Sequence, residues 1–174
     1  MAYNRTEKRI KRCSRQYGGT AQISRTDALC RECSRGEDPR GLGRWVWQMY
    51  RGNNNRRLRV VTAYRPNPST GPFTVYAQHR ALFHELNKRE WEPREQMLID
   101  LQNEINQWTG QGEQVVLMMD CNKDVRSDRM KKFLDEVGMK ECILEKYGED
   151  APATYIDGRT PIDGIFTTWS INIK

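Results

Sequence analysis

The chain has 174 residues and carries 29 Lys and Arg against 23 Asp and Glu, a formal net charge of +6. This length predicts one domain. Apolar runs stay well short of the ~20 residues of a membrane span, and the basic start is not followed by the apolar stretch of a secretory signal. We therefore expect no membrane contact and an intracellular location, either cytoplasmic or nuclear.

The first part of the chain is expected to hold an arm and then strands. Residues 1–16 are rich in Lys and Arg, which predicts a basic, flexible arm. The elements expected after it are a short strand over 18–24, a loop over 31–43 and a hairpin over 44–64, whose strands flank the turn sequence GNNN.

The rest of the chain is expected to alternate helices and strands. Three prolines between residues 65 and 72 exclude helix and ladder there. The expected elements are a helix over 75–89, a helix from Pro93 to Gly110, a buried strand over 114–119, a helix that Ser127 caps and Gly138 ends, and strands over 154–156 and 162–168. This order predicts an α/β or α+β domain.

The charge is uneven along the chain. Residues 1–65 hold 16 basic and 5 acidic side chains, a balance of +11, whereas residues 66–174 hold 13 and 18, a balance of −5. Arg outnumbers Lys by 20 to 9, and guanidinium groups bind phosphate in a bidentate fork. A phosphate-bearing partner such as nucleic acid and a solvated basic face explain this composition equally well.

Cysteine usage indicates reduced thiols rather than a disulfide scaffold, because the count is odd. The five cysteines are Cys13, Cys30, Cys33, Cys121 and Cys142. The Cys30–Cys33 pair stands alone as a CxxC motif, and His79 and His84 would diverge on a helix. We therefore expect no zinc.

The strongest local feature is the strand VVLMM, which delivers Asp120 and Asn122 to its carboxyl end. Alternate residues point the same way on an extended backbone, so these two side chains can face one cleft. A carboxylate can bind a divalent metal or orient water, and an amide can donate to a phosphate oxygen. Strand context alone favours a simpler interpretation, an Asx turn at the strand end.

Two further strand ends carry polar side chains. A strand ends on Tyr64, and a rigid loop then presents Arg65 and Asn67, whose side chains can all donate to phosphate oxygens. A surface loop beside a packed tyrosine is the alternative. Asp163 lies inside an apolar strand, where a carboxylate needs a partner, so it belongs to a site or anchors a turn.

In this order the three features resemble the endonuclease/exonuclease/phosphatase superfamily. The motifs are TAYRPNP (62–68), MMDCN (118–122) and PIDGIF (161–166), with further likeness in GGTAQIS (18–24), DPRGLGRWVW (38–47), VYAQHR (75–80) and PATY (152–155). Within the superfamily, these motifs most resemble nuclease-like domains associated with retroelement reverse transcriptases. The resemblance covers roughly residues 17–174 and implies a partial four-layer α/β sandwich of two packed, mainly antiparallel or mixed sheets flanked by helices.

The resemblance also implies roles for individual residues. The catalytic set would be Tyr64 at the scissile phosphate, Asp120 and Asn122 at the attacking water and a Mg²⁺ or Mn²⁺ ion, and Asp163 as the carboxylate that orients a histidine. Arg65, Asn67 and Thr154 would contact the substrate. The implied reaction is metal-assisted hydrolysis of a phosphodiester, with DNA as the expected partner.

The sequence also departs from the family pattern. The family's early metal-binding Glu and its closing Ser-Asp-His have no counterpart here, since Glu7 lies in the basic arm and neither histidine has the required context. We therefore expect residues 17–174 to be an incomplete domain. The alternatives are a catalytically silent fragment that binds nucleic acid electrostatically, and a phosphatase of the same superfamily acting on lipid or small phosphoesters.

Overall fold

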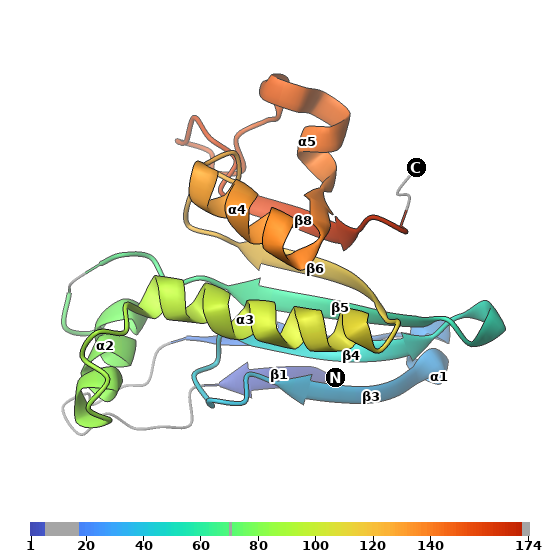
Figure 1. Ribbon diagram of the computed structural model, residues 1–174, viewed down its shortest axis with the longest axis horizontal. Helices are drawn as coiled ribbons and strands as arrows, with labels where there is room; N and C mark the ends of the chain where they lie inside the picture. The colour runs from blue at the N-terminus through green and yellow to red at the C-terminus, as the bar shows by residue number, and fades with distance from the viewer. Residues whose placement is uncertain (6–17, 70, 172–174) are drawn as a thin grey trace.

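The computed structural model describes residues 1–5, 18–69 and 71–171 (Figure 1). The strands in these ranges are β1 (Ala2–Arg5), β2 (Gly19–Gln22), β3 (Glu32–Glu37), β4 (Trp45–Arg51), β5 (Arg57–Tyr64), β6 (Gln114–Asp120), β7 (Met139–Glu141) and β8 (Asp163–Thr168). The helices are α1 (Asp27–Arg31), α2 (Val75–Glu85), α3 (Pro93–Gly110), α4 (Asp128–Val137) and α5 (Cys142–Tyr147), with 3-10 turns η1 (Asn53–Asn55) and η2 (Gly148–Asp150).

A six-stranded mixed sheet organises the fold. Its strand order is β3-β4-β5-β6-β8-β7, in which β5 and β6 run parallel and the other neighbouring strands run antiparallel. Helices α2 and α3 form the connection between β5 and β6, as parallel neighbours require. The predicted α/β class is therefore confirmed.

The hydrophobic core lies between this sheet and helices α3 and α4, which cover one of its faces in Figure 1. Alternation along β6 turns Val115, Leu117 and Met119 toward the helices, and all three are buried. The predicted apolar stripe of α3 is buried against them, with Leu101 and Ile105 fully enclosed. Burying one such side chain contributes about 1.5–3 kcal/mol, so this interface is the main source of stability.

A second, two-stranded sheet lies against the other face. Strands β1 and β2 pair antiparallel and contact β3, β4 and β5. The Ser24 hydroxyl, just after β2, donates to Gln48 Oε1 at 2.9 Å. Gln48 points away from the helices, because Trp45 and Trp47 on the same strand pack into the core. The layers are thus helices, six-stranded sheet and two-stranded sheet.

Several predicted elements are confirmed and three need correction. The hairpin of β4 and β5, helices α2 and α3 and strands β6 and β8 lie where the sequence places them, although α2 ends at Glu85. Residues 2–5 form β1, so the predicted flexible arm does not include them, and residues 6–16 lie outside the described ranges. Residues 154–156 form no strand, because Tyr155 and Ile156 belong to a turn that the Gly158 N–H closes on the Tyr155 carbonyl at 2.9 Å.

The predicted loop over 31–43 contains strand β3. Its Gly and charged residues are typical of loops, yet pairing with β4 overrides that preference. Gly36 lies under the indole of Trp47, where a Cβ would stand 2.4 Å from Cζ2. The glycine therefore makes room for an aromatic ring within a strand.

Helix α4 is bounded as predicted but capped differently. Gly138 ends it in the left-handed conformation, with φ of 63°. Ser127 occupies the N-cap position, but its hydroxyl makes no capping hydrogen bond. No helix among the described residues is both long and apolar enough to cross a membrane.

Candidate active site at one end of the sheet

Three of the predicted catalytic side chains meet at one end of the six-stranded sheet. Tyr64 is the last residue of β5 and is the register partner of Asp120, the last residue of β6. Asp120 is in turn the register partner of Asp163, the first residue of β8. Register partners on neighbouring strands point to the same face, so these side chains form one row.

The row lies on the face opposite the helices. Met119, the neighbour of Asp120, is buried against α3 and α4, so Asp120 points the other way. Met118 and Ile165 share the face of Asp120 and are each 37% exposed. The row therefore faces solvent over β6 and β8, beyond the strands that β1 and β2 contact.

The two carboxylates of the row stand directly opposite each other across an antiparallel pair. Side chains in such a position have Cβ atoms about 4.5–5.5 Å apart, and like charges there are destabilising. Burial raises the pKa of Asp120, and the Asp163 carboxylate raises it further. The Asn122 backbone N–H and the Arg94 charge oppose this rise in pKa. The pair therefore favours a proton or a cation.

Asn122 fixes the turn that follows β6. Its backbone N–H donates to Asp120 Oδ1 at 2.9 Å, which is the Asx turn expected from strand context. Its side-chain amide donates to the Arg65 carbonyl at 2.8 Å, and its φ of 45° lies in the left-handed region that Asn tolerates. The Asx turn and a site role coexist, because the turn holds Asp120 at the row.

The Arg65 guanidinium lies inside the protein, which corrects the prediction that it flanks a bound phosphate. The residue is 3% exposed and donates to Glu95 Oε1 at 2.9 Å. It also reaches the Cys121 carbonyl at 3.5 Å. Burial lowers the pKa of Arg65, and the nearby Arg94 charge lowers it further. Arg65 follows Tyr64 directly, so its side chain turns toward α3 and braces the strand ends from behind.

Arg94 is a component of the site that the sequence analysis missed. It is buried, and it donates to the Pro66 carbonyl at 2.5 Å and to the Asn122 carbonyl at 3.0 Å. It thereby joins the loops that follow β5 and β6. Its position in the first turn of α3 was the available signal, because a cation is unfavourable at a helix N-terminus unless something else holds it.

The remaining predicted residues occupy different positions. Thr154 Oγ1 accepts hydrogen bonds from the Ile162 and Asp163 backbone N–H groups at 3.0 and 3.1 Å, so it anchors the start of β8. Asn67 is exposed in the loop after β5. His79 is buried in α2 with Nε2 at 3.2 Å from the Leu42 carbonyl, and burial lowers its pKa to about 4.

A buried ion network holds α3 against the same end of the sheet. Arg44, which is 1% exposed, donates through Nε and Nη2 to Asp38 at 2.6 and 2.7 Å, and through Nη1 to Asp100 at 2.8 Å. Asp100 also binds Arg40. The Arg44 carbonyl accepts from the Tyr64 N–H at 2.8 Å, so the network adjoins the row.

The oxygen donors of the row suit a hard divalent cation. Mg²⁺ is held by one or two carboxylates together with water and substrate phosphates, and Asp120 and Asp163 supply two carboxylates. No group of three or more His, Cys, Asp and Glu side chains that could hold a metal occurs within the described residues. The donor set is thus sufficient for an ion shared with a phosphate.

Comparisons with known proteins give structural neighbours only. No protein-family model and no curated protein sequence matches the chain. The chain is similar to the human Nocturnin catalytic domain with a TM-score of 0.43 and 14% identity, over 73% of this chain and 42% of that one. It is similar to sphingomyelinase C from Streptomyces griseocarneus with a TM-score of 0.41 and 14% identity, over 75% and 44%.

A third neighbour is named as an endonuclease/exonuclease/phosphatase family protein, from Bacteroides thetaiotaomicron. Its TM-score is 0.40 at 14% identity, over 72% of this chain and 42% of that chain. The chain thus spans less than half the length of each of these structures. Structures of the superfamily indicated by the motifs are therefore among those that this chain is similar to. Association with reverse transcriptases stays a prediction.

Proposed function

We propose that this chain carries the carboxylate-bearing part of a metal-dependent phosphodiester hydrolase of the endonuclease/exonuclease/phosphatase type, acting on nucleic acid and in the first instance on DNA. The observation that carries the proposal is the row of Tyr64, Asp120 and Asp163 in register on three neighbouring strands. The ordered motifs and the excess of Arg support the same function. A reducing, intracellular compartment fits the free thiols of Cys30, Cys33, Cys121 and Cys142.

The residues of the row would divide the chemistry among them. Asp120 would hold a Mg²⁺ or Mn²⁺ ion together with Asp163, which takes this role instead of the histidine-orienting one that the resemblance implies, because it lies opposite Asp120. When bound, the ion supplies charge neutralisation at the phosphate and a more acidic water. Asp120 would orient the attacking water and accept its proton as the new P–O bond forms. The ester P–O bond opposite then breaks, and the leaving oxygen takes a proton from solvent. The Tyr64 hydroxyl would donate to a non-bridging phosphate oxygen.

The same arrangement of residues is compatible with two alternative functions. The absence of a third protein ligand among the described residues favours a catalytically silent chain that binds nucleic acid by charge. The names of neighbouring structures, which include a sphingomyelinase and a mannosyl-6-phosphatase, favour lipid or sugar phosphoesters as a substrate class to be tested.

The test is cleavage of labelled plain and abasic DNA duplexes in Mg²⁺ and in EDTA. We expect cleavage in Mg²⁺ only, and a decrease of about 10²–10⁴-fold in Asp120→Asn, which is the usual contribution of a general base. Asp157→Asn, at an exposed loop carboxylate, is the matched control and should cleave like the wild type.

The three candidates predict different outcomes. Absence of cleavage together with salt-sensitive retention of DNA would support the silent alternative. Metal-dependent hydrolysis of inositol phosphate without cleavage of DNA would support the phosphatase alternative. Cleavage that Asp120→Asn leaves unchanged would contradict the assignment of the site.

A further inference from the structure

The end of the sheet opposite the row, here called the hairpin end, has a separate chemical character. It comprises the turn of residues 52–56 between β4 and β5, the last residue of α1 and the first residues of β3. Strand β5 runs eight residues from Arg57 to Tyr64, so this end lies roughly 23 Å from the row at ~3.3 Å per residue.

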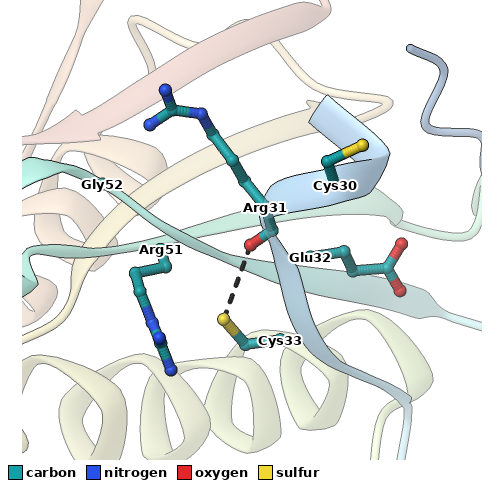
Figure 2. Close-up of a pocket in the computed structure, with 6 residues that line it drawn as sticks. All are labelled: Cys30, Arg31, Glu32, Cys33, Arg51 and Gly52. Atoms are coloured by element: carbon teal, nitrogen blue, oxygen red, sulfur yellow. Dashed lines mark hydrogen bonds between the residues drawn. The ribbon is translucent and has the colours of Figure 1, made fainter. Parts of the chain in front are cut away.

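Two adjoining clefts open at the hairpin end. The first, with a volume of about 450 Å³, is lined by Arg31 and Arg51 together with Cys30 and Cys33 (Figure 2). The second, of about 340 Å³, is lined by Arg56 with two turn asparagines. Both include Gly52, so they form one continuous surface.

Three guanidinium groups of this surface are available to a ligand. Arg31, Arg51 and Arg56 are exposed, and no carboxylate among the described residues pairs with any of them. In Figure 2, the Arg31 and Arg51 guanidinium groups point away from each other, and neither points at Glu32. The surface therefore presents separated cations, spaced by the strands beneath them.

Two of the carboxylates near the clefts, Glu113 and Glu32, are already paired. Glu113 is buried and pairs with Arg59 at 2.7 Å and with Arg57 at 3.7 Å. Glu32 pairs with Arg35 at 2.7 Å and accepts from Gln48 at 2.9 Å. The local charge of the clefts is thus positive, because each of these carboxylates is neutralised by an arginine outside the set of three.

We propose that the hairpin end is a second nucleic-acid contact surface, on which Arg31, Arg51 and Arg56 bind the phosphate backbone of a strand or duplex. All three cations are Arg, whose planar fork matches phosphate oxygens, and Asn53 and Asn54 line the second cleft with amide donors. Phosphate contacts of this kind fix position without reading sequence. The surface rests on the proposed function for its nucleic-acid partner, but it needs neither metal nor hydrolysis, so loss of binding here and loss of cleavage at the row are distinguishable.

The test measures binding of fluorescent DNA duplexes by anisotropy in EDTA, using protein that carries Asp120→Asn to remove any cleavage. The test variant adds Arg31→Gln, Arg51→Gln and Arg56→Gln. The matched control adds Arg80→Gln, Arg89→Gln and Lys131→Gln, which remove the same charge from exposed positions on α2, the turn after it and α4. Thermal melting of each protein verifies the fold.

We expect the test variant to bind about tenfold more weakly and the control to bind as the parent does, since exposed ion pairs each contribute modestly. The slope of log K against log salt should fall by about 2–3 in the test variant, because three phosphate contacts are lost. Duplexes shorter than about seven base pairs, which at ~3.4 Å per step are too short to reach from the hairpin end to the row, should still show the arginine-dependent binding, because the row takes no part in it.

Two results would overturn the proposal. Equal weakening in the test variant and the control would show that net charge alone attracts DNA. Exposed Leu29 on α1 makes an anionic membrane the competing occupant. Binding of phosphatidylserine vesicles that depends on the three arginines, without arginine-dependent binding of DNA, would assign the surface to lipid instead.

Discussion

The two ends of the six-stranded sheet differ in whether they present exposed, unpaired arginines. At the end with the row, Arg44, Arg65 and Arg94 are buried and bind carboxylates or carbonyls of the protein. At the hairpin end, Arg59 is likewise buried and paired with Glu113, but Arg31 and Arg51 are exposed and pair with no carboxylate among the described residues. The buried arginines at the row pair with groups of the protein, whereas the exposed arginines at the hairpin end remain available to a ligand.

This difference indicates how the carboxylates of the row are kept available. The Arg94 charge opposes the rise in the pKa of Asp120, but the Arg94 hydrogen bonds go to the Pro66 and Asn122 carbonyls. The carboxylate oxygens that face solvent are therefore left for a cation or a water. The buried arginines act as positioning residues behind the row. Substituting them should change the geometry and the stability of the row more than the charge that the row presents to a ligand.

The largest expected effect is on the support behind the row. Arg44→Met should lower the free energy of unfolding by about 3–5 kcal/mol, because it leaves the buried Asp38 and Asp100 carboxylates without their shared partner. Urea denaturation measures this difference. Arg80→Met, at an exposed position on α2, should change stability by less than about 0.5 kcal/mol. A loss below 1 kcal/mol for Arg44→Met would show that the network is not needed.

Divalent cations should stabilise the protein by binding at the row and not at the hairpin end. At a Mg²⁺ concentration of ten times its dissociation constant, the wild type should gain about 1.4 kcal/mol of stability, because the ion binds only the folded row. Thermal melting with and without EDTA measures the gain. Asp120→Asn should lose it, while the three-arginine variant should retain it. A shift that survives Asp120→Asn would place the cation elsewhere.

Strand ends could be predicted from the sequence, whereas side-chain partners could not. Tyr64, Asp120 and Asp163 each terminate or begin an apolar or alternating run, so their membership of one edge followed from local pattern. The register that aligns them depends on hydrogen bonds between β5, β6 and β8, which no local pattern encodes.

The errors have the same physical origin. Arg65 was assigned to the substrate from its chemistry, but alternation past Tyr64 and the Glu95 carboxylate on α3 turned it inward. Strand β3 was missed because its Gly and charges look like a loop, and only the ladder with β4 and the Trp47 ring above Gly36 make it a strand. In both cases a tertiary partner overrode a correct local preference.

A smaller effect is expected where Thr154 anchors the start of β8. Thr154→Val removes the acceptor of two backbone N–H groups, at Ile162 and Asp163, while keeping the shape of the side chain. Because the site is exposed and water can replace the hydroxyl, the loss should be about 1 kcal/mol. Thr154→Ser restores the acceptor and should recover most of it. The urea midpoints of the wild type and the two variants measure these differences in stability. Equal losses of stability in Thr154→Val and Thr154→Ser would exclude the hydrogen bonds as the cause.

The smallest expected effect concerns the charge of Asp120, which burial and then the Asp163 carboxylate make unfavourable. A carboxyl whose pKa is raised in the folded state destabilises the fold above that pKa and ceases to do so as the pH falls toward its value in the unfolded chain, 3.8. Asp120→Asn removes this carboxylate while keeping an oxygen that can accept the Asn122 N–H, so without metal the variant should be more stable at neutral pH.

The gain should be about 0.2–1 kcal/mol, the general size of interactions between directly opposite cross-strand side chains. Its pH dependence identifies the cause, since the difference between Asp120→Asn and wild type should shrink as the pH is lowered to 4. Comparing the two proteins at each pH cancels the acid loss from carboxyls with lowered pKa, such as Asp100. A difference that stays constant down to pH 4 would mean that neither burial nor the Asp163 carboxylate penalises the charge of Asp120, and the row would then lose its reason to attract a cation.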